Sequence, residues 1–408
     1  MNHKISFGIL ISIVMIGIIT IVAAQQPGIP FEHPEPIQMQ NGAPTWTPSS
    51  VPPTPSHLMP VIIGFKEKPD VELVKGLGGE IKRQFRITPA ISARMPAGMI
   101  ERLKANPNVA YVEQDAIAYA LAETMPWGVD KIDADQVWTS PYNNKGTGIK
   151  VAILDTGIQY NHNDLKNNIK GGVNFAFPYP DGCTSYICWT DRNGHGTHVS
   201  GTVAAEDNEI GVIGVAPESN LYAVKVLSDS GSGYYSDVIQ GLEWAMNNNM
   251  HIISMSLGGT YDSQTLHDAI DAARTANVIV VAAAGNSGDG NPDTDNMIYP
   301  AKYDSVISVG ATDSNDNVAS WSSDGMALDV SAPGVNVLST YLKSRYAYGS
   351  GTSMAAPHTS GTIALMLKSG ISPAEIQNKL QTKSVDLLPS GWDRYSGWGR
   401  INALFAVQ

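Results

Sequence analysis

Short apolar runs alternate with amphipathic segments through the last two thirds of the chain. Five of these runs are rich in β-branched residues and lack polar alternation, as is typical of strands buried on both faces. They are residues 149–154, 221–227, 252–257, 278–284 and 306–309. Residues 235–249 place Val238, Leu242 and Ala245 on one helical stripe, and residues 263–277 form a second helical segment. The alternation predicts an α/β class domain, a three-layer α/β/α architecture with a mainly parallel sheet.

A different pattern precedes this region. It predicts strand, helix, strand, strand, helix and strand, at residues 61–65, 69–77, 81–87, 91–95, 97–105 and 109–113. This order is that of a small ferredoxin-like α+β domain. About 60 residues without a disulfide bury too little surface for much stability, so we expect this domain to need a partner surface.

The N-terminus has the features of an export signal. Lys4 precedes an apolar run over residues 5–22, which ends in the small residues Ala23 and Ala24. The run is long for a signal and close to the minimum for a membrane span, so cleavage after residue 24 and retention as an outer-face anchor both stay open. Residues 25–60 are rich in proline and predict a linker.

Composition narrows the partners. The 408 residues are 43% hydrophobic, which suits a large core, and the formal net charge is -12. Nucleic-acid binding requires basic patches, so the acidic balance argues against it. The protein is expected to have no nucleic-acid partner. We also expect a secreted monomer with no stable membrane association after signal cleavage.

Three polar residues in separate motifs supply an acid, a base and a hydroxyl. Asp155 ends an apolar run, His195 lies between two glycines, and Ser353 precedes an apolar helical stretch at residues 354–367. Active sites of open α/β sheets lie at the carboxyl ends of strands, where Asp155 and also Asn286 are expected. Amide hydrolysis needs a nucleophile, a base, a group that orients the base, and donors to the oxyanion.

Each residue also has a simpler interpretation. Ser353 is suited to cap a helix, and Asp155 is suited to form a turn. His195 and His198 have a spacing compatible with metal binding, but the segment lacks the acidic helix of a zinc protease. It is the combination of the four motifs that favours catalysis.

The motifs at residues 153–157, 193–198, 284–288 and 350–358 resemble those of the subtilase family of serine proteases, and the similarity runs from about residue 61 to the C-terminus. The resemblance implies that Asp155 orients the base, His195 is the general base and then the general acid, and Ser353 is the nucleophile. It implies that Asn286 donates to the oxyanion beside the backbone N–H of Ser353.

The resemblance also implies substrate-binding segments. Two segments would pair with an extended peptide, namely Gly231, Ser232 and Gly233 and then Ser256, Leu257 and Gly258. The latter three and residues 283–285, with Ala283 and Gly285, would wall the first side-chain pocket. Ser287 stands where some relatives carry Glu, so we expect a large apolar side chain rather than Lys or Arg before the scissile bond.

A structural Ca²⁺ is implied as cofactor. Residues 204–212 resemble the calcium loop of the family. The implied ligands are the Asp164 carboxylate, the Asn208 amide, Glu123, and the carbonyls of Glu206, Ile210 and Val212. Oxygen ligands in this number suit Ca²⁺ better than Mg²⁺. Glu123 stands where relatives often have Gln.

Residues 61–121 resemble the propeptide of the family, an intramolecular chaperone and inhibitor, which agrees with the marginal size of that domain. The resemblance places the mature peptidase at residues 122–408, with self-cleavage between Leu121 and Ala122. We thus expect a self-processing zymogen of an endopeptidase with broad specificity, whose partners are peptide and protein substrates and its own propeptide.

Residues 175–192 form a longer segment than minimal subtilases have. It carries Asp181, Asp191 and both cysteines, Cys183 and Cys188. A local disulfide is the default in an exported protein, because a metal pair would need two further soft ligands. The segment either shapes the rim of the groove or binds another ion, and the sequence leaves both open.

Two rival functions are considered. A non-catalytic scaffold would normally have lost at least one of the four motif residues, and all four are present. A serine esterase of the α/β-hydrolase type has Gly-x-Ser-x-Gly and places its His last. Here the serine comes last, within Gly351-Thr352-Ser353-Met354-Ala355, so a serine endopeptidase is favoured.

Overall fold

The computed structural model describes residues 58–115, 123–178, 181–291, 293–387 and 389–408. Two compact units form, one from residues 41–121 and one that contains residues 122–408. The predicted signal, most of the linker, and Leu121 with Ala122 lie outside the described residues. Within the described ranges, no helix has the length and apolar character needed to cross a membrane.

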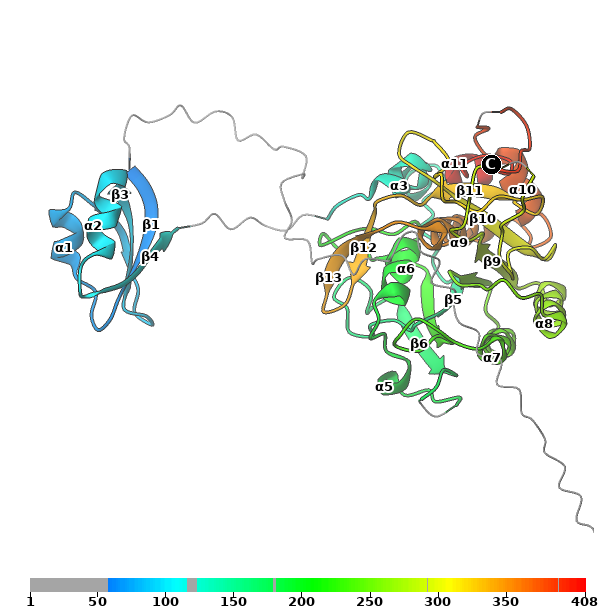
Figure 1. Ribbon diagram of the computed structural model, residues 1–408, viewed down its shortest axis with the longest axis horizontal. Coiled ribbons are helices and arrows are strands. Elements are labelled where there is room, and N and C mark those ends of the chain that lie inside the picture. The colour runs from blue at the N-terminus through cyan, green and yellow to red at the C-terminus, as the bar shows by residue number, and fades with distance from the viewer. Residues whose placement is uncertain (1–57, 116–122, 179–180, 292, 388) are drawn as a thin grey trace, which may run out of the picture. The chain divides into compact units, whose positions relative to one another are not determined.

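The small unit has the predicted ferredoxin-like order of elements. It contains β1 (Leu58–Phe65), α1 (Val71–Gly76), β2 (Glu80–Gln84), β3 (Ala90–Pro96), η1 (Ala97–Met99), α2 (Ile100–Lys104) and β4 (Val109–Gln114). The antiparallel sheet has the order β2-β3-β1-β4 (Figure 1). Val74 of α1 and Leu103 of α2 pack with Ile63, Ile91 and Met95 of the sheet, so both helices bury their apolar sides against it.

One prediction for this unit is wrong in extent. The strand expected over residues 81–87 ends at Gln84. Beyond it the chain turns toward β3, and the Ile87 side chain is 99% exposed. An isolated β-branched residue therefore extended the predicted strand, although it buries nothing.

The large unit holds nine strands and nine helices among its described residues. The strands are β5 (Lys150–Asp155), β6 (Ile169–Asn174), β7 (Asn220–Lys225), β8 (Ile252–Met255), β9 (Ile279–Ala283), β10 (Val306–Thr312), β11 (Val330–Pro333), β12 (Val337–Tyr341) and β13 (Arg345–Gly349). The helices are α3 (Trp127–Lys131), α4 (Ala134–Trp138), α5 (Tyr186–Trp189), α6 (His195–Ala204), α7 (Tyr235–Asn247), α8 (Gln264–Thr275), α9 (Thr352–Lys368), α10 (Ile376–Lys383) and α11 (Ala403–Ala406).

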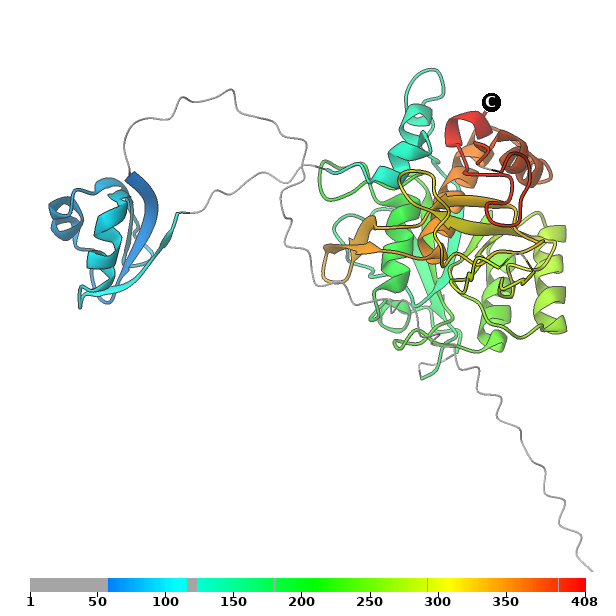
Figure 2. The same ribbon diagram turned by 45° about the horizontal axis from the view of Figure 1, so that its top comes forward.

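Seven strands form a parallel sheet in the order β11-β10-β9-β8-β5-β7-β6. Helices cover both faces, and α7 and α8 lie side by side on one of them (Figures 1 and 2). Alternate residues of β5 enter different cores: Ile153 packs with α6 and α9, whereas Leu154 packs with α7 and α8. The predicted three-layer α/β/α fold is confirmed.

The sequence pattern missed two strands of this sheet and the antiparallel hairpin β12–β13. The sequence of β6, IKGGVN, has two glycines in its centre, and β11 is only four residues long. Neither has the continuous β-branched run by which the other five were predicted. Their pairing along the sheet edges, rather than local propensity, makes them strands.

Candidate active site

Asp155 and His195 meet although 40 residues separate them. Asp155 is the last residue of β5, and His195 is the first residue of α6. The Nδ1 atom of His195 lies 2.8 Å from Oδ1 and 2.9 Å from Oδ2 of Asp155. The Asp155 side chain is 0% exposed and that of His195 is 16% exposed. The carboxylate is therefore placed to hold the imidazole with its Nε2 edge available for chemistry.

The environment of His195 suits a base that takes a proton during the reaction. Burial lowers the pKa of His195, but the charge and the hydrogen bond of Asp155 outweigh burial, and the net pKa is raised. Asp191 adds a smaller charge effect in the same direction. A raised pKa means that the protonated imidazole is favoured, as a proton-accepting catalyst requires.

His198 has a different role from His195. Its Nε2 lies 3.1 Å from the carbonyl of Val337 and 3.0 Å from that of Ala347, so it donates to the β12–β13 hairpin. Burial lowers the pKa of His198 to about 4. It is thus a neutral residue of the core that ties α6 to the hairpin, and the metal-pair interpretation fails.

Ser353 lies in the first turn of α9, a 17-residue helix that packs on α6. Gly351 occupies the N-cap position and no side chain caps the helix, so the capping interpretation of Ser353 is wrong. The Oγ of Ser353 donates to the carbonyl of Ser256 at 3.4 Å, and the Oγ of Ser256 donates to the carbonyl of Ser353 at 2.8 Å. The N-terminus of a long helix directs partial positive charge at this hydroxyl.

Asn286 is fixed beside the same helix terminus. Its Oδ1 accepts hydrogen bonds from the backbone N–H and the hydroxyl of Thr352, at 2.9 and 3.0 Å. The hydroxyl oxygen of Thr352 in turn accepts from the N–H of Gly285 at 3.2 Å. Because Oδ1 is held by Thr352, Nδ2 is the atom of the amide that is left to donate toward a substrate oxygen.

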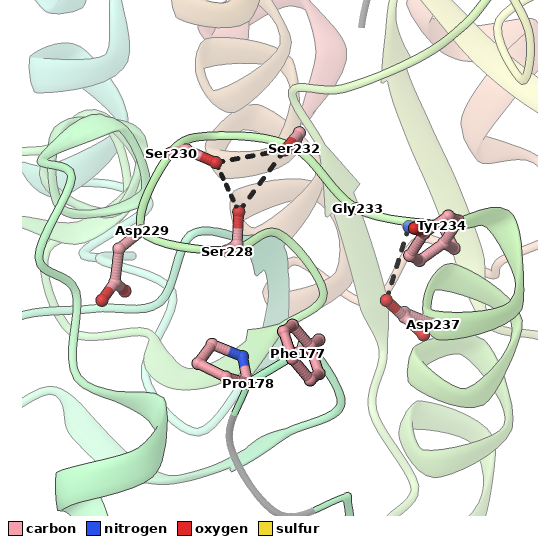
Figure 3. Close-up of a pocket in the computed structure, with 9 residues that line it drawn as sticks. All are labelled: Phe177, Pro178, Ser228, Asp229, Ser230, Ser232, Gly233, Tyr234 and Asp237. Carbon is pink, nitrogen blue, oxygen red and sulfur yellow. Dashed lines mark hydrogen bonds between the residues drawn. The ribbon is translucent and has the colours of Figure 1, made fainter. Parts of the chain in front are cut away.

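The segment of Gly231, Ser232 and Gly233 belongs to a tight loop that follows β7. The N–H of Ser228 donates to the carbonyl of Ser232 at 2.8 Å, and Gly231 has a φ of 82°. The hydroxyls of Ser228, Ser230 and Ser232 form hydrogen bonds with one another (Figure 3). These serines line one side of a cavity of about 420 Å³, and Phe177 and Pro178 line the opposite side. The segment thus lies in a turn that its own backbone closes, and its pairing with an extended peptide stays a prediction.

Ser256, Leu257 and Gly258 directly follow β8 and likewise lie outside the sheet. Ala283 ends β9, and Gly285 has a φ of 113°. The side chain of Ile298 lies between these two segments. A methyl group built on Gly258 would lie 2.6 Å from its Cδ1, and one built on Gly285 would lie 3.2 Å from its Cγ1. Ile298, which sequence reasoning missed, therefore lies against both segments predicted to wall the first side-chain pocket.

The predicted calcium ligands come together around Asp164. Its Oδ1 accepts from Nδ2 of Asn208 at 3.0 Å, and its Oδ2 accepts from the N–H of Val212 at 3.0 Å. Oε1 of Glu123 accepts from the N–H of Asn208 at 2.9 Å. Oδ1 of Asn208 accepts from the N–H of Ile210 at 3.1 Å. Hydrogen bonds thus link residues from three distant segments of the chain.

The chemistry of this donor set fits a hard cation. The pKa of Asp164 is raised to about 7, chiefly by burial and to a smaller extent by the charge of Glu123, while its hydrogen bonds act in the opposite direction. Two carboxylates that destabilise each other's charge are relieved by a cation. The carboxylate of Glu206 is held by Asn167, which leaves its backbone carbonyl for the ion. Across the described ranges no three His, Cys, Asp or Glu side chains form a metal-binding group, so the set relies on amide and carbonyl oxygens.

Cys183 and Cys188 form a disulfide in the structure. It lies within residues 175–192, which also contribute Phe177 and Pro178 to the cavity beside the 228–234 loop. This position is next to one of the segments predicted to bind substrate. The placement favours the rim interpretation of the insertion over the ion interpretation.

Sequence reasoning missed residues that connect these parts. Lys225 ends β7, is fully buried, and donates from Nζ to the carbonyl of Thr156 at 2.6 Å. It also pairs with Asp229 at 3.0 Å. A lysine at the end of an otherwise apolar strand, on the sheet edge that carries Asp155, was the available signal. Asp191 was noted only as part of the insertion.

Comparison with known proteins agrees with this geometry. Residues 146–399 match the model of the subtilase family. The chain is 41% identical to subtilisin E of Bacillus subtilis over 360 residues, which cover 85% of this chain and 90% of that protein. It is 43% identical over 346 residues to an alkaline protease of Alkalihalobacillus alcalophilus, with 84% of each chain covered. It is 49% identical over 290 residues to subtilisin DY of Bacillus licheniformis, which cover 70% of this chain and all of that protein.

The family match covers more than half of the chain, and these identities extend over most of it. Both agree with a parallel α/β sheet that carries an Asp–His pair at its carboxyl edge. The chain therefore belongs to the subtilase family of serine endopeptidases.

Proposed function

We propose that Asp155, His195, Ser353 and Asn286 carry out the hydrolysis of peptide bonds through an acyl-enzyme. The observation that carries this proposal is the buried contact between Asp155 and Nδ1 of His195. It leaves Nε2 to accept the proton of the Ser353 hydroxyl as Oγ attacks the carbonyl carbon of the substrate. The negative charge that develops on the carbonyl oxygen accepts hydrogen bonds from Nδ2 of Asn286 and the N–H of Ser353.

Collapse of the tetrahedral intermediate breaks the C–N bond. The departing amine takes the proton from Nε2 of His195, and the acyl group stays on Oγ of Ser353. A water then gives a proton to His195 and attacks the ester, and the proton returns to Oγ as the acid product leaves. Asp155 stays ionised throughout and stabilises the imidazolium at both stages.

The protein is proposed to be a secreted zymogen. Residues 1–24 direct export, and residues 25–60 form a linker between the signal and the propeptide. Residues 61–121 are the propeptide, which inhibits the peptidase at residues 122–408 and assists its folding. The small core of the ferredoxin-like unit supports a role that depends on a partner surface. Self-cleavage between Leu121 and Ala122 would leave residues 119–121 in the groove as a product.

Calcium is proposed to bind where Glu123, Asp164 and Asn208 meet, together with the carbonyls of Glu206, Ile210 and Val212. When bound, the ion supplies positive charge that offsets the two carboxylates. The residues themselves already link the start of the mature domain to the 206–212 loop, since the N–H of Thr124 donates to the carbonyl of Gly211 at 2.7 Å. The proposed role of the calcium ion is therefore to stabilise the fold rather than to take part in catalysis.

A phosphonylating probe tests the proposed nucleophile. We expect a fluorophosphonate to modify the active enzyme at one residue, Ser353, because the proposed mechanism gives this hydroxyl a general base and oxyanion donors. Peptide mapping by mass spectrometry locates the label, and heat-denatured enzyme is the control that should take up none. A label on another serine, or full activity after complete labelling elsewhere, would contradict the proposal.

The first substrate pocket is proposed to take a large apolar side chain whose length is limited by Ile298. The Ile298→Ala variant is expected to raise the ratio of kcat/KM for a Phe substrate over a Leu substrate by about 10-fold, because it deepens the pocket. A pair of peptides that differ only before the scissile bond measures this ratio. Ile187→Ala, at an exposed apolar residue of the insertion, is the control. If the ratio were unchanged in both variants, Ile298 would not be part of the pocket.

A further inference from the structure

Asp191 is a second buried carboxylate beside the proposed catalytic base. Its Oδ1 accepts from the hydroxyl of Thr156 at 2.9 Å and from the N–H groups of Asn193 and Gly194, at 2.9 and 3.0 Å. Its Oδ2 accepts from the N–H and the hydroxyl of Thr197, at 2.9 and 2.6 Å. Only 4% of the residue is exposed. The chemistry proposed above uses none of these contacts.

The five donors lie on both sides of His195 and on the strand end that carries Asp155. Thr156 directly follows Asp155, while Gly194 and Thr197 flank His195 in the chain. The hydroxyl oxygen of Thr156 also accepts from the N–H of Gly196 at 2.9 Å. One carboxylate therefore joins the end of β5 to the first turn of α6, and the distance between these two elements sets the Asp155–His195 contact.

We propose that Asp191 is a positioning residue for His195, whose hydrogen bonds hold the first turn of α6 against the end of β5 and whose charge supports the imidazolium formed during the reaction. The inference rests on the catalytic roles proposed for Asp155, His195 and Ser353. The five hydrogen bonds to the Asp191 carboxylate all come from N–H or O–H donors, which matches an ionised carboxylate that only accepts hydrogen bonds. Neither oxygen needs a proton of its own.

Several titratable groups face His195 and Asp191. His195 is faced by Asp155 from β5, by Asp191 from the preceding loop and by His198 from its own helix. Asp191 is faced in addition by Tyr341 of β12, and Lys225 of β7 contacts the carbonyl of Thr156. Burial raises the pKa of Asp191, and its hydrogen bonds oppose this. Of these groups, Asp191 is the charge beyond Asp155 that raises the pKa of His195.

The test is the pH profile of kcat/KM for the mature enzyme with a peptide substrate. The acid limb reports protonation of the base in the free enzyme. Asp191→Asn keeps the size and removes the charge, so the midpoint of the acid limb is expected to move to lower pH. Because the amide nitrogen cannot accept from Thr197, kcat is also expected to fall by about 10- to 100-fold.

Thr156 supplies the matched variants. Thr156→Val removes the hydroxyl that joins Asp191 to Gly196 but keeps the carboxylate, so kcat should fall while the midpoint of the acid limb stays at the wild-type value. Thr156→Ser keeps the hydroxyl and should restore kcat. The second-order rate of fluorophosphonate labelling gives the same pH profile from folded molecules alone, so partial unfolding of a variant does not obscure the result.

An Asp191→Asn profile that coincides with the wild type would overturn the role of the charge. Equal shifts of the acid limb in Asp191→Asn and Thr156→Val would overturn it too, since misplacement of His195 would then explain both. A kcat unchanged in both variants would overturn the positioning role. Failure of the proposed catalytic roles is distinct, because wild-type enzyme would then show no label at Ser353 at any pH.

Discussion

The full-length Ser353→Ala variant is expected to lose peptide hydrolysis and to remain uncleaved at residues 121–122. Without Oγ no acyl-enzyme forms, and what remains is catalysis by the oxyanion donors and by substrate binding. In subtilisin, itself a subtilase, removal of the catalytic serine lowers kcat by about 2 × 10⁶-fold. Intact mass of purified protein measures processing, and turnover of a chromogenic peptide measures activity.

Wild-type protein refolded beside it should yield a fragment that begins at Ala122. Ser256→Ala is a useful companion variant, since it removes the hydroxyl that donates to the carbonyl of Ser353 but leaves the nucleophile. It should still process, with reduced kcat. If Ser353→Ala released the same fragment in pure form, the nucleophile and self-processing would both be wrong. If neither protein were cleaved but wild type took the fluorophosphonate label, another protease must remove the propeptide.

Chelation of calcium is expected to lower the thermal stability of the mature domain strongly. A ligand that binds only the folded state stabilises it by about 4 kcal/mol at a thousandfold excess over its Kd. Because each kcal/mol shifts the Tm of a domain of this size by about 2–4 °C, EDTA should lower the Tm by about 10 °C. The measurement is best made on enzyme inactivated at Ser353, so that self-digestion does not add to unfolding.

Variants of two acidic residues distinguish the loss of a calcium ligand from the loss of a nearby charge. Asp164→Asn removes a proposed ligand and should abolish most of the calcium-dependent rise in Tm. Asp207→Asn makes the same change of charge in the 206–212 loop, but Asp207 pairs with Lys145 and is not a proposed ligand. It should keep the rise. A Tm that does not depend on calcium in the wild type would exclude the site.

Much of the fold followed from the sequence because its signals are local. β5, β8, β9 and β10 are dominated by apolar residues, as burial on both faces of the sheet requires. Their lengths were predicted to within a few residues. β6 and β11 were missed because two glycines interrupt the first and Ser331 and Pro333 interrupt the second, and their pairing at the sheet edges makes them strands.

In the candidate site, too, some features follow from the local sequence and others from tertiary contacts. The motifs around Asp155, His195, Asn286 and Ser353 named the groups that the chemistry requires, since each residue type is suited to its role wherever it lies in the chain. The family resemblance assigned the base to His195, but residue type and spacing alone do not separate it from His198. The difference is a contact: one ring meets Asp155 and the other meets the hairpin β12–β13.

The sequence by itself determined the fold class, the order of the elements in the small unit, five strands of the large sheet and the set of reactive side chains. The tertiary structure decided which of those side chains touch. It placed Asp191 under the first turn of α6, Ile298 between Gly258 and Gly285, and Glu123 beside the 206–212 loop. These pairs are distant in the chain or joined through backbone atoms, and local propensity carries no information about such contacts. They exist because the packed sheet and helices bring the segments together.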